Sequence, residues 1–149
     1  MRFWLPALVV IAAASASAHH PFTPYYDASR PGSITGPIVE LRAINPHVVL
    51  IIAGTAPDGR TGLWAFEGSA PNAFLRRQKD FREKLKVGTR ITISGWPAKD
   101  PQARAFSANT VTFADGTTMV FGSTTPSGWQ CSDRVPPETA CAPYTYPAP

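Results

Sequence analysis

The fold of this chain is decided by one stretch, SITGPIVELRA at residues 33–43. Its apolar side chains alternate as in a β-strand, with Ile34 and Ile38 on one side. The apolar residues that follow fall on the opposite side: Val39, Leu41 and Ala43. The change of side comes at Gly36-Pro37, and such a shift predicts a β-bulge or a sharp coil. Strands of small barrels bend in this way, so the stretch indicates a barrel.

Further strands follow along the chain, separated by turn signals. Residues 48–53 form a continuous apolar run, which is typical of a strand covered on both faces. The remaining strands are predicted at residues 63–66, 90–95 and 105–113, with a short sixth strand at 117–121. The strand at 105–113 shifts its phase near Asn109-Thr110, as the first strand does at its Gly-Pro pair.

The segment between the third and fourth strands changes to a helical period. One helical stripe contains Phe74, Gln78, Phe81 and Leu85, with Leu75 beside them. Ser69 is the expected N-cap, and Pro71 lies in the first turn. The pattern allows a break near Lys79, because no signal ends the helix before Gly88.

Together these elements predict a mainly β fold, a small OB-like five- to six-stranded barrel with one helix between strands 3 and 4. The barrel domain is expected at residues 33–122. A signal peptide at 1–18 and an N-terminal arm at 19–32 precede it. After Gly122 the composition changes to Pro, Ser and Thr, so residues 123–149 are expected to form a Pro-rich tail outside the barrel.

The first residues have the parts of a secretory signal peptide. Arg2 supplies the positive start, and residues 3–14 supply an apolar region too short to span a membrane. Ala16-Ser17-Ala18 is a small-x-small cleavage site, so the mature chain is expected to begin at His19. This predicts a periplasmic or secreted protein with no membrane span after cleavage.

The charge of the chain favours no anionic macromolecule as partner. The formal net charge is +4 at pH 7, which is only mildly basic. Much of the charge on the predicted helix is paired at i,i+4, which favours a solvated helix face over an anion-binding patch. The pairs are Arg76/Asp80, Lys79/Glu83 and Asp80/Lys84. OB barrels often bind single-stranded nucleic acid, but export argues against a nucleic-acid partner here.

The sequence does not indicate an enzyme. It lacks the nucleophile elbow, the P-loop, the dinucleotide fingerprint and the helical zinc motif. Glu40 and Glu67 are carboxylates on predicted strands that can face a cleft, but any barrel of this size has such residues. Trp64, Phe66 and Phe113 are interpreted as core residues rather than as a ligand cage.

A series of short motifs stands in a fixed order along the chain. They are HHPF at residues 19–22, NPH at 45–47, Trp64, SAPNAFLRR at 69–77, a glycine-bounded strand at 88–95, AKD at 98–100 and DG at 115–116. In this order they resemble a bacterial family of small exported domains of unknown function, over residues 18–122. The resemblance implies export and an OB-like barrel, but no activity. Gln78 departs from the family, which usually has glycine there, and the cysteine-containing tail looks like a local extension.

All three histidines of the chain can serve one metal site. At a mature N-terminus, His19 offers its amino nitrogen and Nδ1 to one ion, and His47 or His20 supplies a further imidazole. Nitrogen ligands in such an array suit Cu(II). Cleavage one or two residues earlier places a histidine third in the chain, which also chelates Cu(II) or Ni(II). The alternative interpretation is a solvated terminus at His19 and His20, with His47 capping a turn.

The chain has two cysteines, Cys131 and Cys141. In an exported protein the pair is expected to form a structural disulfide that closes a loop in the tail, and the spacing is not a redox motif.

Two functional hypotheses therefore stay open. The first is a non-enzymatic exported barrel that binds a metal, with copper as the best choice, through His19 and either His47 or His20. The second is a metal-free binding or accessory module that recognises a peptide, a glycan or a partner protein on the barrel face. Contact between the mature terminus and His47 would favour the first.

Overall fold

The computed structural model describes residues 25–122 and, in the tail, the backbone of residues 129–131 and 141–143. The barrel strands are β1 (Gly32–Ala43), β2 (Val48–Thr55), β3 (Thr61–Glu67), β4 (Arg90–Pro97), β5 (Ala105–Phe113) and β6 (Thr118–Val120). Two helices, α2 (Pro71–Arg77) and α3 (Phe81–Lys84), lie between β3 and β4. In the tail, β7 (Trp129–Cys131) and β8 (Cys141–Pro143) form a separate two-stranded sheet.

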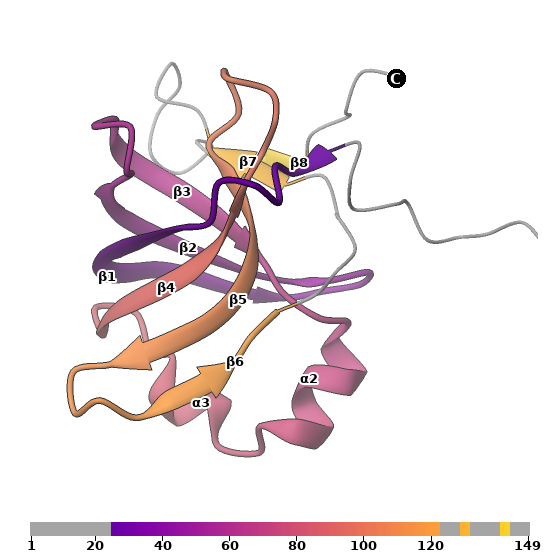
Figure 1. Cartoon of the computed structure of the whole chain (residues 1–149). Coiled ribbons are helices and arrows are strands. Elements are labelled where there is room, and N and C mark those ends of the chain that lie inside the picture. Colours follow the sequence, from indigo (N-terminus) through magenta and orange to yellow (C-terminus); the bar gives the residue numbers. More distant parts are fainter. Residues whose placement is uncertain (1–24, 123–128, 132–140, 144–149) are drawn as a thin grey trace, which may run out of the picture.

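The main sheet closes on itself. Its strands are hydrogen-bonded in the order β3-β2-β1-β4-β5-β6, and β3 also pairs in parallel with β5. Strands β1 to β5 therefore form a closed barrel, with β6 as an additional strand beside β5 (Figure 1). The predicted mainly β fold is confirmed. Helices α2 and α3 lie at one end of the barrel, and the β4–β5 connection lies at the opposite end (Figure 1).

The long first strand bends because it serves two neighbours. Its first half pairs with β4 up to Pro37, and its second half pairs with β2 from Ile38 onward. A Cβ on Gly36 would lie 1.7 Å from the carbonyl oxygen of Ala53, so only glycine fits here, where β1 changes partner from β4 to β2. The bulge itself lies at Val39, two residues after the predicted Gly36-Pro37 pair. The Gly-Pro pair thus marks the change of partner rather than the irregularity.

The second predicted phase shift is confirmed. Ile93 of β4 pairs with Val111, and Gly95 pairs with Ala108, so β5 contains one more residue than β4 over this interval. The extra residue falls at Asn109-Thr110, where a bulge increases the local bend of the strand.

The segment predicted as helical forms two short helices, α2 and α3, and the break at residues 78–80 falls near Lys79, where the sequence pattern allowed one. Seven residues of helix would separate Phe74 from Phe81 by about 10 Å along the axis. Instead their ring centroids lie 5.2 Å apart, edge to face, and Phe74 also contacts Phe121 at 5.1 Å. The chain must turn between the two rings for both to cover the same end of the barrel.

Ser69 is not the N-cap that the sequence suggests. Ala70 occupies the cap position of α2 and makes no side-chain cap bond. The Ser69 hydroxyl is buried and donates to the carbonyl oxygen of Gly122 at 2.9 Å. It therefore joins the end of β3 to the end of β6.

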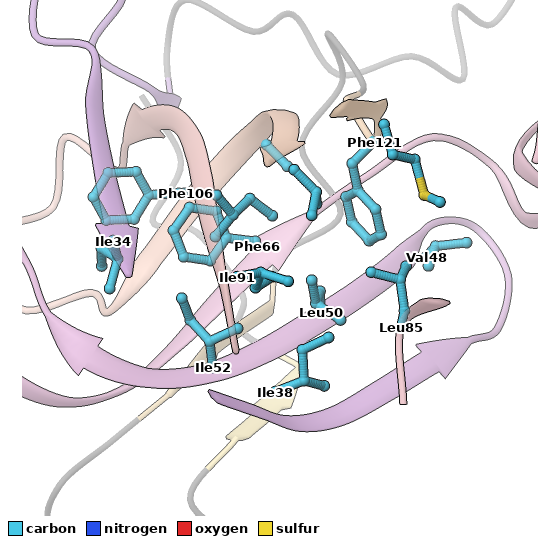
Figure 2. Close-up of a cluster of buried hydrophobic side chains, with 14 of the residues drawn as sticks. Ile34, Ile38, Val48, Leu50, Ile52, Phe66, Leu85, Ile91, Phe106 and Phe121 are labelled. Carbon is cyan, nitrogen blue, oxygen red and sulfur yellow. The ribbon is translucent and has the colours of Figure 1, made fainter. Parts of the chain in front are cut away.

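The barrel interior is a single apolar cluster, to which all of β1 to β6 and both helices contribute. Figure 2 shows Ile38, Leu50 and Ile91 pointing toward one another from three strands. Phe66 and Phe106 stack with centroids 4.9 Å apart. Burial of such side chains supplies roughly 1.5–3 kcal/mol each, so this cluster is the main source of stability.

A smaller apolar cluster lies apart from the interior one. Val49, Ile51 and Ala65 belong to β2 and β3 and are almost fully buried. Strand β7 of the tail lies beside β3.

Among the described residues, no helix is long and apolar enough to cross a membrane.

Candidate functional site

A cavity of about 610 Å³ opens at the end of the barrel away from the helices. It lies between the start of β1, the β2–β3 turn and the β4–β5 connection. Its buried floor consists of Ala56, Trp64, Ala98, Ala103, Ala105 and Phe106. The size is within the range of small-molecule sites, which is about 300–1,000 Å³.

Trp64 is the largest side chain of the floor. Its ring lies under two guanidinium groups, with the carbon of Arg60 at 5.0 Å and that of Arg104 at 5.2 Å from the ring centroid. Its indole Nε1 is buried and has no hydrogen-bond acceptor within residues 25–122. A buried N–H without an acceptor is costly to the fold.

Arg60 spans the mouth of the cavity. Its Nε donates to Oδ2 of Asp58 at 2.8 Å, within the same turn. One terminal nitrogen donates to the carbonyl oxygen of Pro101 at 2.9 Å, across the opening. Two hydrogen bonds and the Trp64 ring therefore fix the guanidinium, and in the described part of the chain its remaining N–H groups have no acceptor.

The charged rim contains three cationic side chains and one carboxylate, namely Arg30, Arg60, Lys99 and Asp58. Partial burial raises the pKa of Asp58, but hydrogen bonds from the Arg60 backbone and side chain outweigh this and hold the pKa below its usual value. Arg30 is paired with Asp27. Lys99 is exposed, and the structure shows no ion pair for it among the described residues.

His47 lies at the other end of β2 from the cavity, directly after a cis Asn45–Pro46 peptide bond. Its Nδ1 is 2.9 Å from the carbonyl oxygen of Gly68. A carbonyl can only accept, so Nδ1 carries the proton, and in the neutral ring Nε2 presents a lone pair. This is the arrangement in which a histidine binds a metal through Nε2.

A family model described as a family of unknown function (DUF6152) matches residues 7–107. The chain belongs to the DUF6152 family. The matched stretch contains every residue that lines the cavity and all three histidines, whereas Cys131 and Cys141 lie beyond it. No curated protein and no solved structure matches the chain.

The family match confirms part of the resemblance drawn from the motifs, since this DUF6152 protein belongs to a family of unknown function. The bacterial source, export and the meaning of the histidine motif stay predictions. The predicted signal peptide, His19 and His20 lie outside the described residues. Within the described residues, no three His, Cys, Asp or Glu side chains form a group that could hold a metal ion.

The other residues that the sequence of this DUF6152 protein singled out lie at separate positions in the structure. Glu67 does not face a cleft, because it is fully buried and accepts a hydrogen bond from Tyr26. Glu40 pairs with Arg42 on the barrel surface. Cys131 and Cys141 are direct partners in the register of β7 and β8, and nothing is described of their side chains.

Trp64 and Phe66 lie in the core, as the sequence predicts, but sequence reasoning missed that Trp64 also lines a cavity. It also missed Arg60 and Lys99. The available signals were the turns PDGR at 57–60 and AKDP at 98–101, each of which contains a cationic residue and a proline. Nothing local shows that the two turns face each other.

Proposed function

We propose that this DUF6152 protein is an exported, non-enzymatic binding protein that holds a small ligand, or one group of a partner, in the barrel-end cavity. The observation that carries the proposal is the cavity itself, with its buried aromatic floor and charged rim. Ligand sites of small barrels commonly lie at the mouth of the barrel, where loops supply a few polar groups above an apolar floor.

The charged groups of the rim support binding rather than catalysis. General acid–base catalysis works best with a group whose pKa lies near the working pH. The carboxyl of Asp58 has its pKa lowered by Arg60 and stays ionised in an ion pair. Arg60 is itself fixed by two hydrogen bonds, which suits a recognition role.

The cavity is tested by recording amide spectra of the mature protein while a library of small organic fragments is added. Ligands of the cavity should shift amides near residues 30–32, 56–64 and 97–106. Ala103→Leu fills the floor and should abolish these shifts, whereas Ala114→Leu on an exposed turn should retain them. Shifts that scatter over the barrel, or that survive Ala103→Leu in a folded protein, would contradict the proposal.

Export is part of the proposal and rests on the signal-peptide pattern at residues 1–18. Mass spectrometry of protein recovered from the periplasm or the medium should give a chain that starts at His19. A product that retains residues 1–18 would remove the proposed compartment and the proposed N-terminus together.

A Cu(II) site is the second candidate function, because the Nδ1–H of His47 is bound and its Nε2 is left for a ligand. The backbone of the described arm lies beside the β4–β5 connection, where Tyr26 bridges to Ala98, and the Tyr26 side chain reaches the end of β3. Tyr26 bonds to Glu67, and the next residue, Gly68, accepts from His47. Residues 19–24 span up to about 20 Å when extended. This length supports a site in which His19, with His20 as the alternative, joins His47 on one ion.

A further inference from the structure

The cavity at the barrel end combines an apolar floor with hydrogen-bond donors at its mouth. The floor is formed by alanine side chains, Phe106 and Trp64. The donors are the N–H groups of Arg60 that have no acceptor in the described chain and the ammonium of Lys99. A ligand that satisfies both parts has an apolar body and a group that only accepts hydrogen bonds.

The position of Arg60 selects the kind of accepting group. A guanidinium presents its N–H groups in a planar fork, which matches the two oxygens of a carboxylate better than any neutral group. The fork is fixed before a ligand arrives, because Asp58, Pro101 and the Trp64 ring hold it. Little side-chain freedom is therefore lost on binding.

The charge balance agrees with an anionic head group. Arg30 and Arg60 each have a carboxylate partner, Asp27 and Asp58, so these pairs are close to neutral. Lys99 adds one positive charge to the rim with no ion pair among the described residues. A cationic ligand would meet this excess of positive charge and a set of donors that it cannot use.

Building on the proposed binding function, we propose that the cavity binds the carboxylate of an organic acid with a small apolar body, with Arg60 as its anchor. The same chemistry can come from a free acid or from the C-terminal carboxylate of a peptide. A glycan fits less well, because Trp64 is 1% exposed and both guanidinium groups lie against its ring.

The test compares benzoate with benzamide and benzylamine, which keep the apolar ring and change only the head group. Amide shifts of the mature, full-length protein report both the site and the affinity. Benzoate should bind in the cavity at least about tenfold more tightly than benzamide, as expected for a charge-assisted hydrogen bond to a fixed arginine. A peptide ending in a free phenylalanine carboxylate, beside the same peptide as its amide, distinguishes a peptide terminus from a free acid.

Variants of the rim show whether Arg60 is the anchor. Arg60→Met should remove the preference for benzoate, whereas Arg90→Met, an exposed arginine at the start of β4, should leave it unchanged. Asp58→Asn keeps an acceptor for Arg60 but removes the competing charge, so it should tighten benzoate binding. This second variant keeps the test decisive if Arg60→Met loosens the turn.

The outcomes separate this proposal from the one on which it rests. If benzamide or benzylamine shifts the same amides as strongly as benzoate, the carboxylate class is wrong and the cavity remains a binding site. If Asp58→Asn weakens benzoate binding, Arg60 is not the anchor. If neither the fragment library nor any probe shifts the cavity amides, the proposed function itself fails.

Discussion

The hydroxyl of Tyr26 donates a hydrogen bond of 2.8 Å to Oε2 of Glu67, and both side chains are fully buried. The bond joins the segment before β1 to the last residue of β3. A buried carboxylate that loses a donor incurs a desolvation cost. Tyr26→Phe should therefore lower the free energy of unfolding by about 1–3 kcal/mol, measured by urea denaturation.

Substitutions at Glu67 and Glu40 compare this buried hydrogen bond with an ion pair on the barrel surface. Glu67→Gln should also destabilise, and the double variant should cost less than the two single changes added together. Glu40→Gln, which removes a surface ion pair with Arg42, should change stability by less than about 1 kcal/mol. Equal effects at Glu40 and Glu67 would show that the buried bond has no special role.

Gly36→Ala should be strongly destabilising, because the new Cβ would meet the Ala53 carbonyl oxygen at 1.7 Å. Backbone must move to relieve this clash, at a cost of about 3 kcal/mol. Gly116→Ala is the control, since that residue has φ of +82° in open space and should cost only about 1 kcal/mol. Similar midpoints of thermal unfolding for the two variants would contradict the close approach of Gly36 to the Ala53 carbonyl.

Asp27 should titrate well below an ordinary aspartate. Its pKa is lowered from 3.8 to about 2, first by the Ser29 hydroxyl and then by the Arg30 side chain. Because the folded pKa is the lower one, this carboxylate stabilises the fold above about pH 4, and its contribution is lost as pH falls toward 2. Carbon-detected NMR titration should give this value, and Ser29→Ala should raise it. A midpoint near 3.8 in the unaltered protein would exclude the turn as described.

Cu(II) binding to the processed protein should depend on His47 far more than on His20. Its Nε2 is the nitrogen left for a ligand, and the hydrogen bond from Nδ1 to Gly68 holds the ring in place. His47→Ala should weaken binding strongly, His20→Ala weakly, and one residue added before His19 should disrupt the site. Binding should weaken as pH falls, since ligands bind deprotonated. Affinities equal to that of a peptide with the same terminus would show that no folded site exists.

The tail should contain a disulfide in exported protein. Cys131 and Cys141 stand opposite each other in an antiparallel pair, where Cα atoms lie about 4.5–5.5 Å apart, within disulfide range. Cys131→Ser should increase amide exchange beyond residue 122 while the barrel still unfolds in one transition. Two free thiols in freshly recovered protein would refute the bridge.

Local patterns were enough to predict the strands, because alternation and turn residues act over a few positions. They located the bulge at Asn109-Thr110, and they placed the irregularity of β1 only a short distance from Val39. They failed at Ser69, whose hydroxyl bonds to Gly122 instead of the helix that follows it. As an N-cap this hydroxyl would accept from a backbone N–H, whereas here it donates to a distant carbonyl, and only the tertiary fold decides between the two roles.

The cavity could not be predicted in the same way, because its parts meet only after the barrel closes. Arg60 follows a turn that the sequence shows clearly, but its acceptor Pro101 is 41 residues away. The sequence predicts that Trp64 is a core residue, and its side chain does belong to the core. What makes it part of a site is the cavity that its side chain lines.

The parallel contact between β3 and β5 joins Ala65–Glu67 to Ala105–Ser107, and this has a consequence for the order of folding. The pairing of β3 with β5 cannot form until the chain has been synthesised beyond residue 107. Until then, β3 and β4 each have an unpaired edge, which is a template for pairing with other chains. Contacts so distant in sequence also form slowly. A chain cut short before residue 105 should therefore self-associate rather than fold, even though most of the apolar core is already present.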